Sequence, residues 1–286
     1  MNILIVGGSG FLGKALCLFL KKKRIKTYTL SRTKLINKNH IKCDISNRLI
    51  LKEKLNKLNV NFDFAINLSG QVNSDKQKMK KVIIDGNKNL INYFKNKNTT
   101  ILLMSSILVY SSSKKILSEK GKLLPKNYYS FLKIKAENLM KKKCKNFIIF
   151  RVGNIYDSSF KKKGLFKNIL KSINSLKKIN FLNTKSSRSY MHLSDFCEAI
   201  YKCVINCGNK QINKIYNLGH QNLTNMKIIK TFERVFKVKI NYQNMNKDFL
   251  LDPIVKINSK KFVKKYNFKF QYNFERELRK YEKKYF

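Results

Sequence analysis

The chain has 286 residues and a formal net charge of +46, from 62 basic and 16 acidic residues. Its length allows one large domain with a smaller partner, and a hydrophobic content of 43% is ordinary for a globular protein. The longest apolar runs, such as 101–110, contain serines and fall short of the roughly 20 residues that a membrane-spanning helix needs. We therefore expect no membrane span, and the apolar N-terminus lacks the charged leader of a signal peptide.

The basic charge is spread along the chain. Only eight of the basic residues are arginine, and the lysines do not form one patch, which is typical of a coding bias. The alternative is a field that attracts nucleotides, nucleic acid or an acidic membrane surface, and charge alone does not choose between these readings. Six scattered cysteines without a CxxC pair, and three histidines, favour a cytoplasmic protein with reduced thiols and no metal site.

Apolar runs that read as buried strands alternate with helical patterns up to residue 152. The expected strands are 2–6, 27–30, 64–68, 101–105 and 147–151, and the expected helices lie near 11–23, 46–59, 76–97 and 127–143. This alternation predicts an α/β fold, a doubly wound parallel sheet of the Rossmann-like kind with helices on both faces. Beyond residue 152 the pattern loosens into shorter elements, which predicts a smaller C-terminal lobe.

A glycine-rich stretch, "GGSGFLG" at 7–13, follows the first expected strand and opens the first expected helix. Gly7 permits a tight turn, Gly10 lets the backbone approach a pyrophosphate, and Gly13 lets the helix pack closely on the sheet. The N–H groups at the helix start then hold the phosphates. The stretch predicts a dinucleotide site that includes Gly7, Ser9, Gly10, Phe11, Leu12 and Gly13.

The end of the second expected strand bears on the choice of dinucleotide. NAD sites usually place an acid there to accept the ribose 2′-hydroxyl. The stretch at 28–44 has no acid before Asp44 and has Arg32 where the acid would be. The planar guanidinium suits a 2′-phosphate, so the sequence favours NADP(H), with NAD(H) as the alternative.

Two further stretches carry candidate chemistry. "MSSILVY" at 104–110 lies at the end of a buried strand, the rim where ligands bind in such sheets. Tyr129 and Lys133 are four residues apart and share a helix face, although such pairs are frequent in a lysine-rich chain. A neighbouring ammonium and a bound oxidised nicotinamide would lower the pKa of the phenol from about 10, so that it could pass a proton while a serine holds the substrate oxygen.

Taken together, these motifs resemble the extended short-chain dehydrogenase/reductase family, also called the NAD-dependent epimerase/dehydratases. Ser106 stands four residues before the tyrosine of "VY", as the catalytic serine of that family does, and Tyr129, Lys133 and Glu137 fit its "YxxxKxxxE" pattern. The other matching segments follow in the order of the family: "CDIS" (43–46), "NLSG" (67–70), "RVGNIYD" (151–157), "RSYMHLSD" (188–195) and "YNLG" (216–219).

The resemblance implies further site residues and a domain plan. Asp44 and Ile45 would lie near the adenine, and Asn154 and Arg188 would bind a nucleotide-sugar substrate, Arg188 through its diphosphate. The cofactor channel would be lined by Leu68, Ser69, Gly70, Tyr129 and Lys133. The dinucleotide-binding domain would comprise 1–152 plus 188–220, and the substrate-binding lobe 153–187 plus 221–286. The resemblance also implies a homodimer through helices 76–97 and 127–143, and a cytoplasmic role in polysaccharide biosynthesis.

The two residues after Ser106 narrow the reaction. Ile107 and Leu108 stand where related 4,6-dehydratases carry an Asp-Glu pair, and neither side chain can move a proton. Redox chemistry at one carbon remains. Because of Arg32 the sequence favours reduction of a keto-sugar nucleotide with NADPH, with a nucleotide-sugar 4-epimerase that retains NAD as the alternative. A non-catalytic nucleotide- or nucleic-acid-binding Rossmann protein is a remote alternative, since such a protein has no use for Ser106, Tyr129 and Lys133 and the chain has no recognisable nucleic-acid-binding module.

Overall fold

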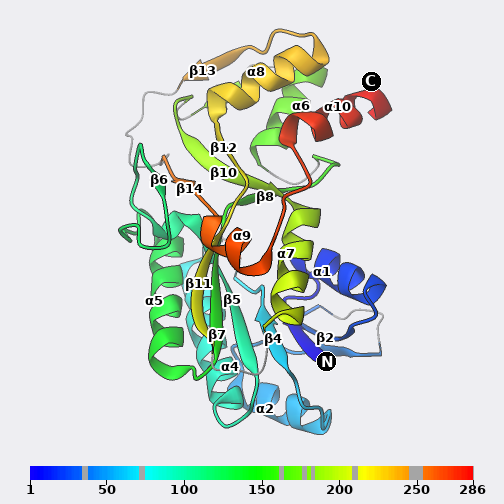
Figure 1. Cartoon of the computed structure of the whole chain (residues 1–286), viewed down its shortest axis with the longest axis vertical. Coiled ribbons are helices and arrows are strands. Elements are labelled where there is room, and N and C mark those ends of the chain that lie inside the picture. The colour runs from blue at the N-terminus through cyan, green and yellow to red at the C-terminus, as the bar shows by residue number, and fades with distance from the viewer. Residues whose placement is uncertain are drawn as a thin grey trace. The chain divides into compact units, whose positions relative to one another are not determined.

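The computed structural model describes residues 1–33, 38–70, 75–160, 164–175, 179–181, 184–207, 212–244 and 254–285. The chain divides into two units, whose elements are labelled in Figure 1. The first unit comprises Met1–Val109, Leu123–Arg151 and Cys197–Tyr216, and the second comprises Tyr110–Lys122, Val152–Phe196 and Asn217–Phe286. Among the described helices, none is long and apolar enough to cross a membrane.

A seven-stranded parallel sheet forms the centre of the first unit, in the order β11-β7-β5-β4-β1-β2-β3. Its strands are β1 (Asn2–Val6), β2 (Lys26–Ser31), β3 (His40–Lys42), β4 (Phe64–Asn67), β5 (Thr100–Ser106), β7 (Phe147–Val152) and β11 (Asn213–Leu218). Val6 at the end of β1 pairs with both Leu30 and Asn67, so β1 lies between β2 and β4. The strand order reverses at β1, and ligands of doubly wound sheets bind at the carboxyl ends of the strands at such a switch point.

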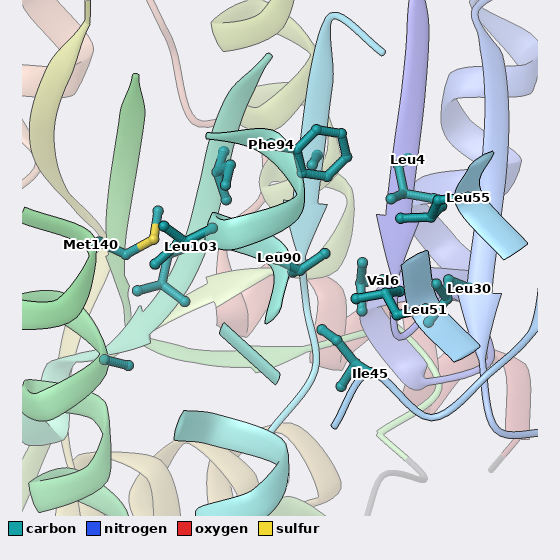
Figure 2. Close-up of a cluster of buried hydrophobic side chains, with 14 of the residues drawn as sticks. Leu4, Val6, Leu30, Ile45, Leu51, Leu55, Leu90, Phe94, Leu103 and Met140 are labelled. Atoms are coloured by element: carbon teal, nitrogen blue, oxygen red, sulfur yellow. The ribbon is translucent and has the colours of Figure 1, made fainter. Parts of the chain in front are cut away.

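Helices cover both faces of this sheet. They are α1 (Phe11–Lys22), α2 (Arg48–Lys57), α3 (Lys76–Lys80), the π-helix η1 (Lys81–Asp85), α4 (Gly86–Phe94), the short 3-10 helix η2 (Ile107–Val109), α5 (Tyr128–Lys143) and α7 (Leu193–Ile205). On one face, side chains of α2, α4 and α5 pack with alternate strand residues in one buried cluster (Figure 2). On the other face, the rings of Phe19 in α1 and Tyr201 in α7 lie 6.1 Å apart. Burial of both faces explains why the strands read as continuous apolar runs.

Among the described residues, the second unit contains a three-stranded mixed sheet, in the order β12-β10-β8, and two two-stranded sheets, β13-β9 and β14-β6. The strands of this unit are β6 (Ile116–Leu117), β8 (Asn154–Tyr156), β9 (Ile179–Phe181), β10 (Ser187–His192), β12 (Gln221–Thr224), β13 (Tyr242–Asn244) and β14 (Lys256–Ile257). Its helices are α6 (Leu165–Ser175), α8 (Asn225–Phe236), α9 (Lys260–Tyr266) and α10 (Phe274–Tyr285). β10 runs parallel to β8 and antiparallel to β12. The core is rich in aromatic rings, and those of Phe166 and Phe274 stack with centroids 4.9 Å apart.

The predicted fold class is confirmed, with one difference inside a helix. The helix expected over 76–97 is three consecutive segments, α3, η1 and α4, because a π-turn interrupts the α-helical pattern before Gly86. A Cβ on Gly86 would lie 2.8 Å from Cγ2 of Ile45, so the glycine lets this helix approach the loop that follows β3. The assignment of dinucleotide and substrate binding to the two predicted domains stays a prediction.

Candidate active site

The glycine loop makes a tight turn between β1 and α1. Gly7 leaves the strand with φ of +84°, in the left-handed region that favours glycine. Its N–H donates to the carbonyl of Leu30 at 2.8 Å, and the N–H of Gly10 donates to the carbonyl of Gly7 at 3.0 Å. A Cβ on Gly13 would lie 2.2 Å from the carbonyl oxygen of Gly7. Only glycine therefore lets α1 pack this closely against the loop, as the motif predicts.

The start of α1 suits an anionic ligand. Its N-cap, Gly10, supplies no side-chain hydrogen bond, and the first turn contains no acidic residue. The first N–H groups of a helix have no partners within the helix and carry the positive end of its dipole. Ser9, Phe11 and Leu12 are half-buried around this turn. The loop thus fits a dinucleotide pyrophosphate, since Gly10 presents no side chain at the first N–H groups of the helix.

Arg32, Asp44 and Ile45 lie on the segment beyond β2. Arg32 follows β2 directly and is exposed, and the sequence from 31 to 43 contains no carboxylate. Asp44 is half-buried, and its Oδ1 accepts hydrogen bonds from the N–H and the hydroxyl of Ser46, both at 2.8 Å. Ile45 is buried in the core of the first unit. The end of β2 therefore carries a cation, and the first carboxylate after it in the sequence is Asp44; the binding of a 2′-phosphate by Arg32 stays a prediction.

The loop after β4 lies against both the glycine loop and Lys133, one of the predicted catalytic residues. The N–H of Leu68 donates to the carbonyl of Val6 at 3.0 Å, and a Cβ on Gly7 would lie 3.2 Å from the carbonyl carbon of Leu68. Gly70 has φ of +109°, and a Cβ there would lie 3.2 Å from Nζ of Lys133. The predicted channel residues 68–70 therefore lie between the glycine loop and Lys133.

Buried asparagines hold these loops, and the sequence reasoning missed them. Oδ1 of Asn67 accepts the N–H and the hydroxyl of Ser69 at 2.9 and 2.6 Å, and its amide donates to Oδ1 of Asn87 at 2.9 Å. The amide of Asn89 donates to the carbonyl of Ile45 at 3.0 Å. The available signal was an asparagine at the end of the otherwise apolar "FAIN", and two more on the buried face of α4.

Ser106, Tyr129 and Lys133 lie on two neighbouring elements of the first unit, β5 and α5. Ser106 ends β5, and its Oγ accepts the N–H of Leu108 at 3.2 Å. Tyr129 and Lys133 lie in the first two turns of α5, with Nζ of Lys133 5.6 Å from the centre of the Tyr129 ring. Nζ also donates to the carbonyl of Met104 at 2.7 Å, two residues before Ser106. This hydrogen bond ties the helix that carries Tyr129 to the strand that carries Ser106.

Burial shifts the pKa values of Lys133 and Tyr129. It lowers the pKa of Lys133 from 10.5 to about 8, against the opposing attraction of Glu137. Burial also raises the pKa of Tyr129 to about 12. The lowering of the Tyr129 pKa that is expected from the ammonium together with a bound oxidised nicotinamide stays a prediction, and it would have to overcome this desolvation. At neutral pH Lys133 is an ammonium and Tyr129 a phenol.

The predicted substrate residues lie in the second unit. Asn154 in β8 pairs with Tyr190 in β10, and Arg188 lies two residues before Tyr190 on the same strand. Asn154 and Tyr190 line a cavity of about 250 Å³, together with aromatic residues that include Tyr156 and Phe166. Arg188 is half-buried and is not among the described residues that line this cavity. The binding of a nucleotide sugar by Asn154 and Arg188 stays a prediction.

Comparisons with known proteins agree with this fold. A dTDP-D-glucose 4,6-dehydratase of Dictyostelium discoideum is 27% identical over 261 residues, which cover 76% of this chain and 58% of that protein. The chain thus spans little more than half the length of this curated relative. The UDP-glucuronic acid 4-epimerase of Bacillus cereus, solved with UDP-glucuronic acid and NAD, aligns over 100% of both chains with a TM-score of 0.83 and 18% identity. The UDP-glucose 4-epimerase of Thermus thermophilus, solved with NAD, aligns over 99% of this chain and 98% of its own with a TM-score of 0.81 and 15% identity.

The sequence itself matches a family model. The model described as the NAD dependent epimerase/dehydratase family matches residues 3–219. The match begins in β1 and ends just after β11, so it includes the glycine loop, Ser106, Tyr129 and Lys133. Because this region is most of the chain, the protein belongs to the NAD-dependent epimerase/dehydratase family.

Proposed function

We propose that the protein is a nucleotide-sugar 4-epimerase that oxidises one sugar carbon and returns the hydride to the opposite face of the same carbon. Family membership and the full-length similarity to two 4-epimerases solved with NAD support this proposal. The sequence favoured an NADPH-dependent reductase because of Arg32, and the comparisons support the 4-epimerase alternative better.

The observation that carries the proposal is the apolar pair that follows Ser106. Ile107 is 1% exposed and Leu108 is half-buried, in the short helix directly after β5. Elimination of water from a sugar needs an acid and a base beside the carbon next to the one that is oxidised. Neither aliphatic side chain can act as either. Hydride transfer without elimination is the family chemistry that this site retains.

Two side chains, Ser106 and Tyr129, would act on the sugar oxygen, and Lys133 would act on Tyr129. The dinucleotide would take and return the hydride. The Ser106 hydroxyl would hold the oxygen of the reacting carbon, and Tyr129 would accept its proton and later return it. Tyr129 must first become a phenolate, which requires the positive charges of Lys133 and of the oxidised nicotinamide together, because burial raises its pKa to about 12.

Binding of the two larger ligands would divide between the two units. The glycine loop and the start of α1 would hold the pyrophosphate of the dinucleotide, with residues 68–70 and Lys133 along its nicotinamide end. Asn154 and Arg188 would bind the nucleotide sugar, since a guanidinium pairs well with a diphosphate. Location in the cytoplasm stays a prediction.

A homodimer through α3–α4 and α5 is part of the proposal. On α5 the ring of Phe131 is 38% exposed and stacks on Tyr128 with centroids 6.1 Å apart. Large exposed aromatic residues are enriched at protein interfaces. Sedimentation of the purified chain should give a dimer, and Phe131→Lys should shift it towards the monomer.

An NADPH-dependent reductase of keto-sugar nucleotides is the second candidate. Arg32 favours it, because the guanidinium at the end of β2 stands where NAD sites place an acid. A reductase exchanges its cofactor, whereas an epimerase keeps the same dinucleotide through the cycle.

The test identifies the dinucleotide and the product together. The freshly purified chain is denatured and any released dinucleotide is identified. Native protein is then incubated with UDP- and dTDP-hexoses, uronic acids and 4-keto-hexoses, with and without added NADPH. Retained NAD and a product of unchanged mass with inverted configuration at C4 would support the epimerase. Consumption of NADPH with keto-sugar nucleotides would support the reductase. A product that has lost water would overturn both.

A further inference from the structure

A buried polar cluster lies behind Ser106, Tyr129 and Lys133. Its centre is Glu137 on α5, which is 0% exposed. Oε1 of Glu137 accepts the hydroxyl of Ser105 at 2.6 Å, and Oε2 accepts Nη2 of Arg151 at 2.7 Å. Nε of Arg151 also donates to Oε1, at 3.0 Å, and Arg151 is 2% exposed. The cluster therefore joins α5 to two neighbouring strands, β5 and β7, through charge-assisted hydrogen bonds.

The position of this cluster connects it with the candidate catalytic side chains. Ser105 directly precedes Ser106 on β5, and Glu137 lies one helical turn beyond Lys133. Glu137, Lys133 and Tyr129 are successive members of one i, i+4 row on α5. The hydrogen bond from Ser105 to Glu137 and the hydrogen bond from Lys133 to Met104 thus hold the same helix to the same strand end.

Stability alone is a weak reason for this arrangement. Removing two charges from water costs several kcal/mol for each ion, and well-packed apolar residues often replace a buried ion pair without loss of stability. The carboxylate has a second effect, because its charge opposes the burial that lowers the pKa of Lys133 to about 8. Without that charge the amine would lose its proton more readily at neutral pH.

We propose that Glu137 is a positioning residue, whose carboxylate, held by Ser105 and Arg151, fixes the place and the charge of the Lys133 ammonium beside Tyr129. The proposal rests on the proposed role of Lys133 in hydride transfer. Among the described residues, Glu137 and Tyr129 face Lys133 from its own helix, and Arg151 lies behind Glu137 on β7. From β5 and the loop after β4, the neutral groups of Met104 and Gly70 face Lys133.

The test compares Glu137→Gln with a matched control, Glu277→Gln. Glu277 is also buried, at 3% exposed, and also accepts a serine hydroxyl and a cation, from Ser158 and Lys280, both at 2.7 Å. It belongs to the second unit. Both variants remove a buried, hydrogen-bonded carboxylate. If Glu137 had a merely structural role, the two variants should change the pKa of Lys133 to a similar extent. If Glu137 positions Lys133, only Glu137→Gln should change that pKa.

The readout is the pKa of Lys133 in the full-length chain with ¹³C-labelled lysine, measured by NMR. Its signal is assigned by its loss in Lys133→Met. We expect Glu137→Gln to lower this pKa by about one unit, which would reduce the ammonium fraction at pH 7 from about nine-tenths to about half. The alkaline limb of the pH–rate profile should move to lower pH by the same amount. Glu277→Gln should leave the pKa unchanged.

A second variant keeps the test valid if Glu137→Gln does not fold. Glu137→Gln/Arg151→Met removes both charges and leaves no unpaired ion in the core, and the pKa of Lys133 should fall in this variant too. An unchanged pKa in the folded Glu137 variants, or an equal fall in Glu277→Gln, overturns the proposal. The titration needs no sugar, so the expected fall in a protein that turns over no nucleotide sugar would refute the proposed function while leaving the influence of Glu137 on Lys133 in place.

Discussion

Gly13→Ala is the sharpest perturbation of the candidate dinucleotide site. The added Cβ would lie 2.2 Å from the carbonyl oxygen of Gly7 and 2.7 Å from the Cα of Gly8. Contacts of a real Cβ stay at about 3.0 Å or beyond, and both neighbours are backbone atoms that no rotamer change can move. The loop and the start of α1 must therefore separate by about 0.8 Å or more to admit the methyl group.

This displacement should reduce both stability and binding. Overpacking of this kind costs about 1–3 kcal/mol in the free energy of unfolding, measured by denaturant titration. A misplacement approaching 1 Å in a preorganised site costs up to about 100-fold, so affinity for the dinucleotide, measured by NADH or NADPH fluorescence, should fall by one to two orders of magnitude.

Variants at two neighbouring positions distinguish overpacking of the loop from direct obstruction of the dinucleotide. Lys14→Ala changes an exposed residue of the same helix turn and should alter neither quantity. Gly10→Ala places its Cβ 3.2 Å from the Gly7 carbonyl with φ of −76°, so the fold should survive while the methyl group obstructs the pyrophosphate. Wild-type stability and affinity in Gly13→Ala would show that the loop and α1 accommodate a methyl group at this position.

Three further predictions concern the charged and proton-transferring residues. Tyr129→Phe should reduce kcat by at least about 100-fold with little change in dinucleotide affinity, and turnover at the wild-type rate would remove Tyr129 from the reaction. The pKa of Lys133 is about 8 in the folded chain and 10.5 ordinarily, so the unfolded chain binds more protons between these two pH values. The free energy of unfolding should therefore rise across this pH window, by about 3 kcal/mol relative to Lys133→Met in denaturant titrations. A difference between the two proteins that does not change with pH would contradict the burial of a charged Lys133. Arg32→Ala should lower the ratio of NADPH to NADH affinity by about tenfold if the guanidinium binds a 2′-phosphate. An unchanged ratio in a fluorescence titration would mean that Arg32 does not contact the cofactor.

Five strands and most of the helices of the first unit could be predicted from the sequence, whereas α7 could not. Runs such as "NILIV" and "FIIF" are buried on both faces of the sheet, so continuous apolar composition alone located β1 and β7. β3 and β11 were not predicted. The three residues of β3, "HIK", include two polar side chains, and β11 begins with two exposed residues, because both strands lie at the edges of the sheet.

The second unit gave a weaker signal. Several of its strands have only two or three residues, too few to show a period, and they include β6, β14 and β8. Its core depends instead on aromatic side chains from α6, α8 and α10 that meet only in the folded chain. Composition could locate a smaller lobe, but not its strand pairing.

The candidate site also combines features that the sequence predicts with features that it does not. Ser106, Tyr129 and Lys133 were located by motif spacing, and the structure places them on neighbouring elements, with Lys133 hydrogen-bonded to the strand that carries Ser106. The pairing of Glu137 with Arg151 joins residues on different elements, which spacing does not reveal. The raised pKa of Tyr129 depends on burial, a property of the packed site rather than of the residue type.

Spectroscopy of the bound nicotinamide would show whether Tyr129 takes part in hydride transfer from a nucleotide sugar. Purified protein is loaded with NAD or NADP, mixed with nucleotide sugars that carry a free 4-hydroxyl, and followed for reduced nicotinamide, with Tyr129→Phe in parallel. We expect substrate-dependent reduction in the wild-type protein, no loss of water from the sugar, and no reduction in Tyr129→Phe that still binds the dinucleotide. Reduction that proceeds equally in Tyr129→Phe, or a dehydrated product, would contradict this expectation.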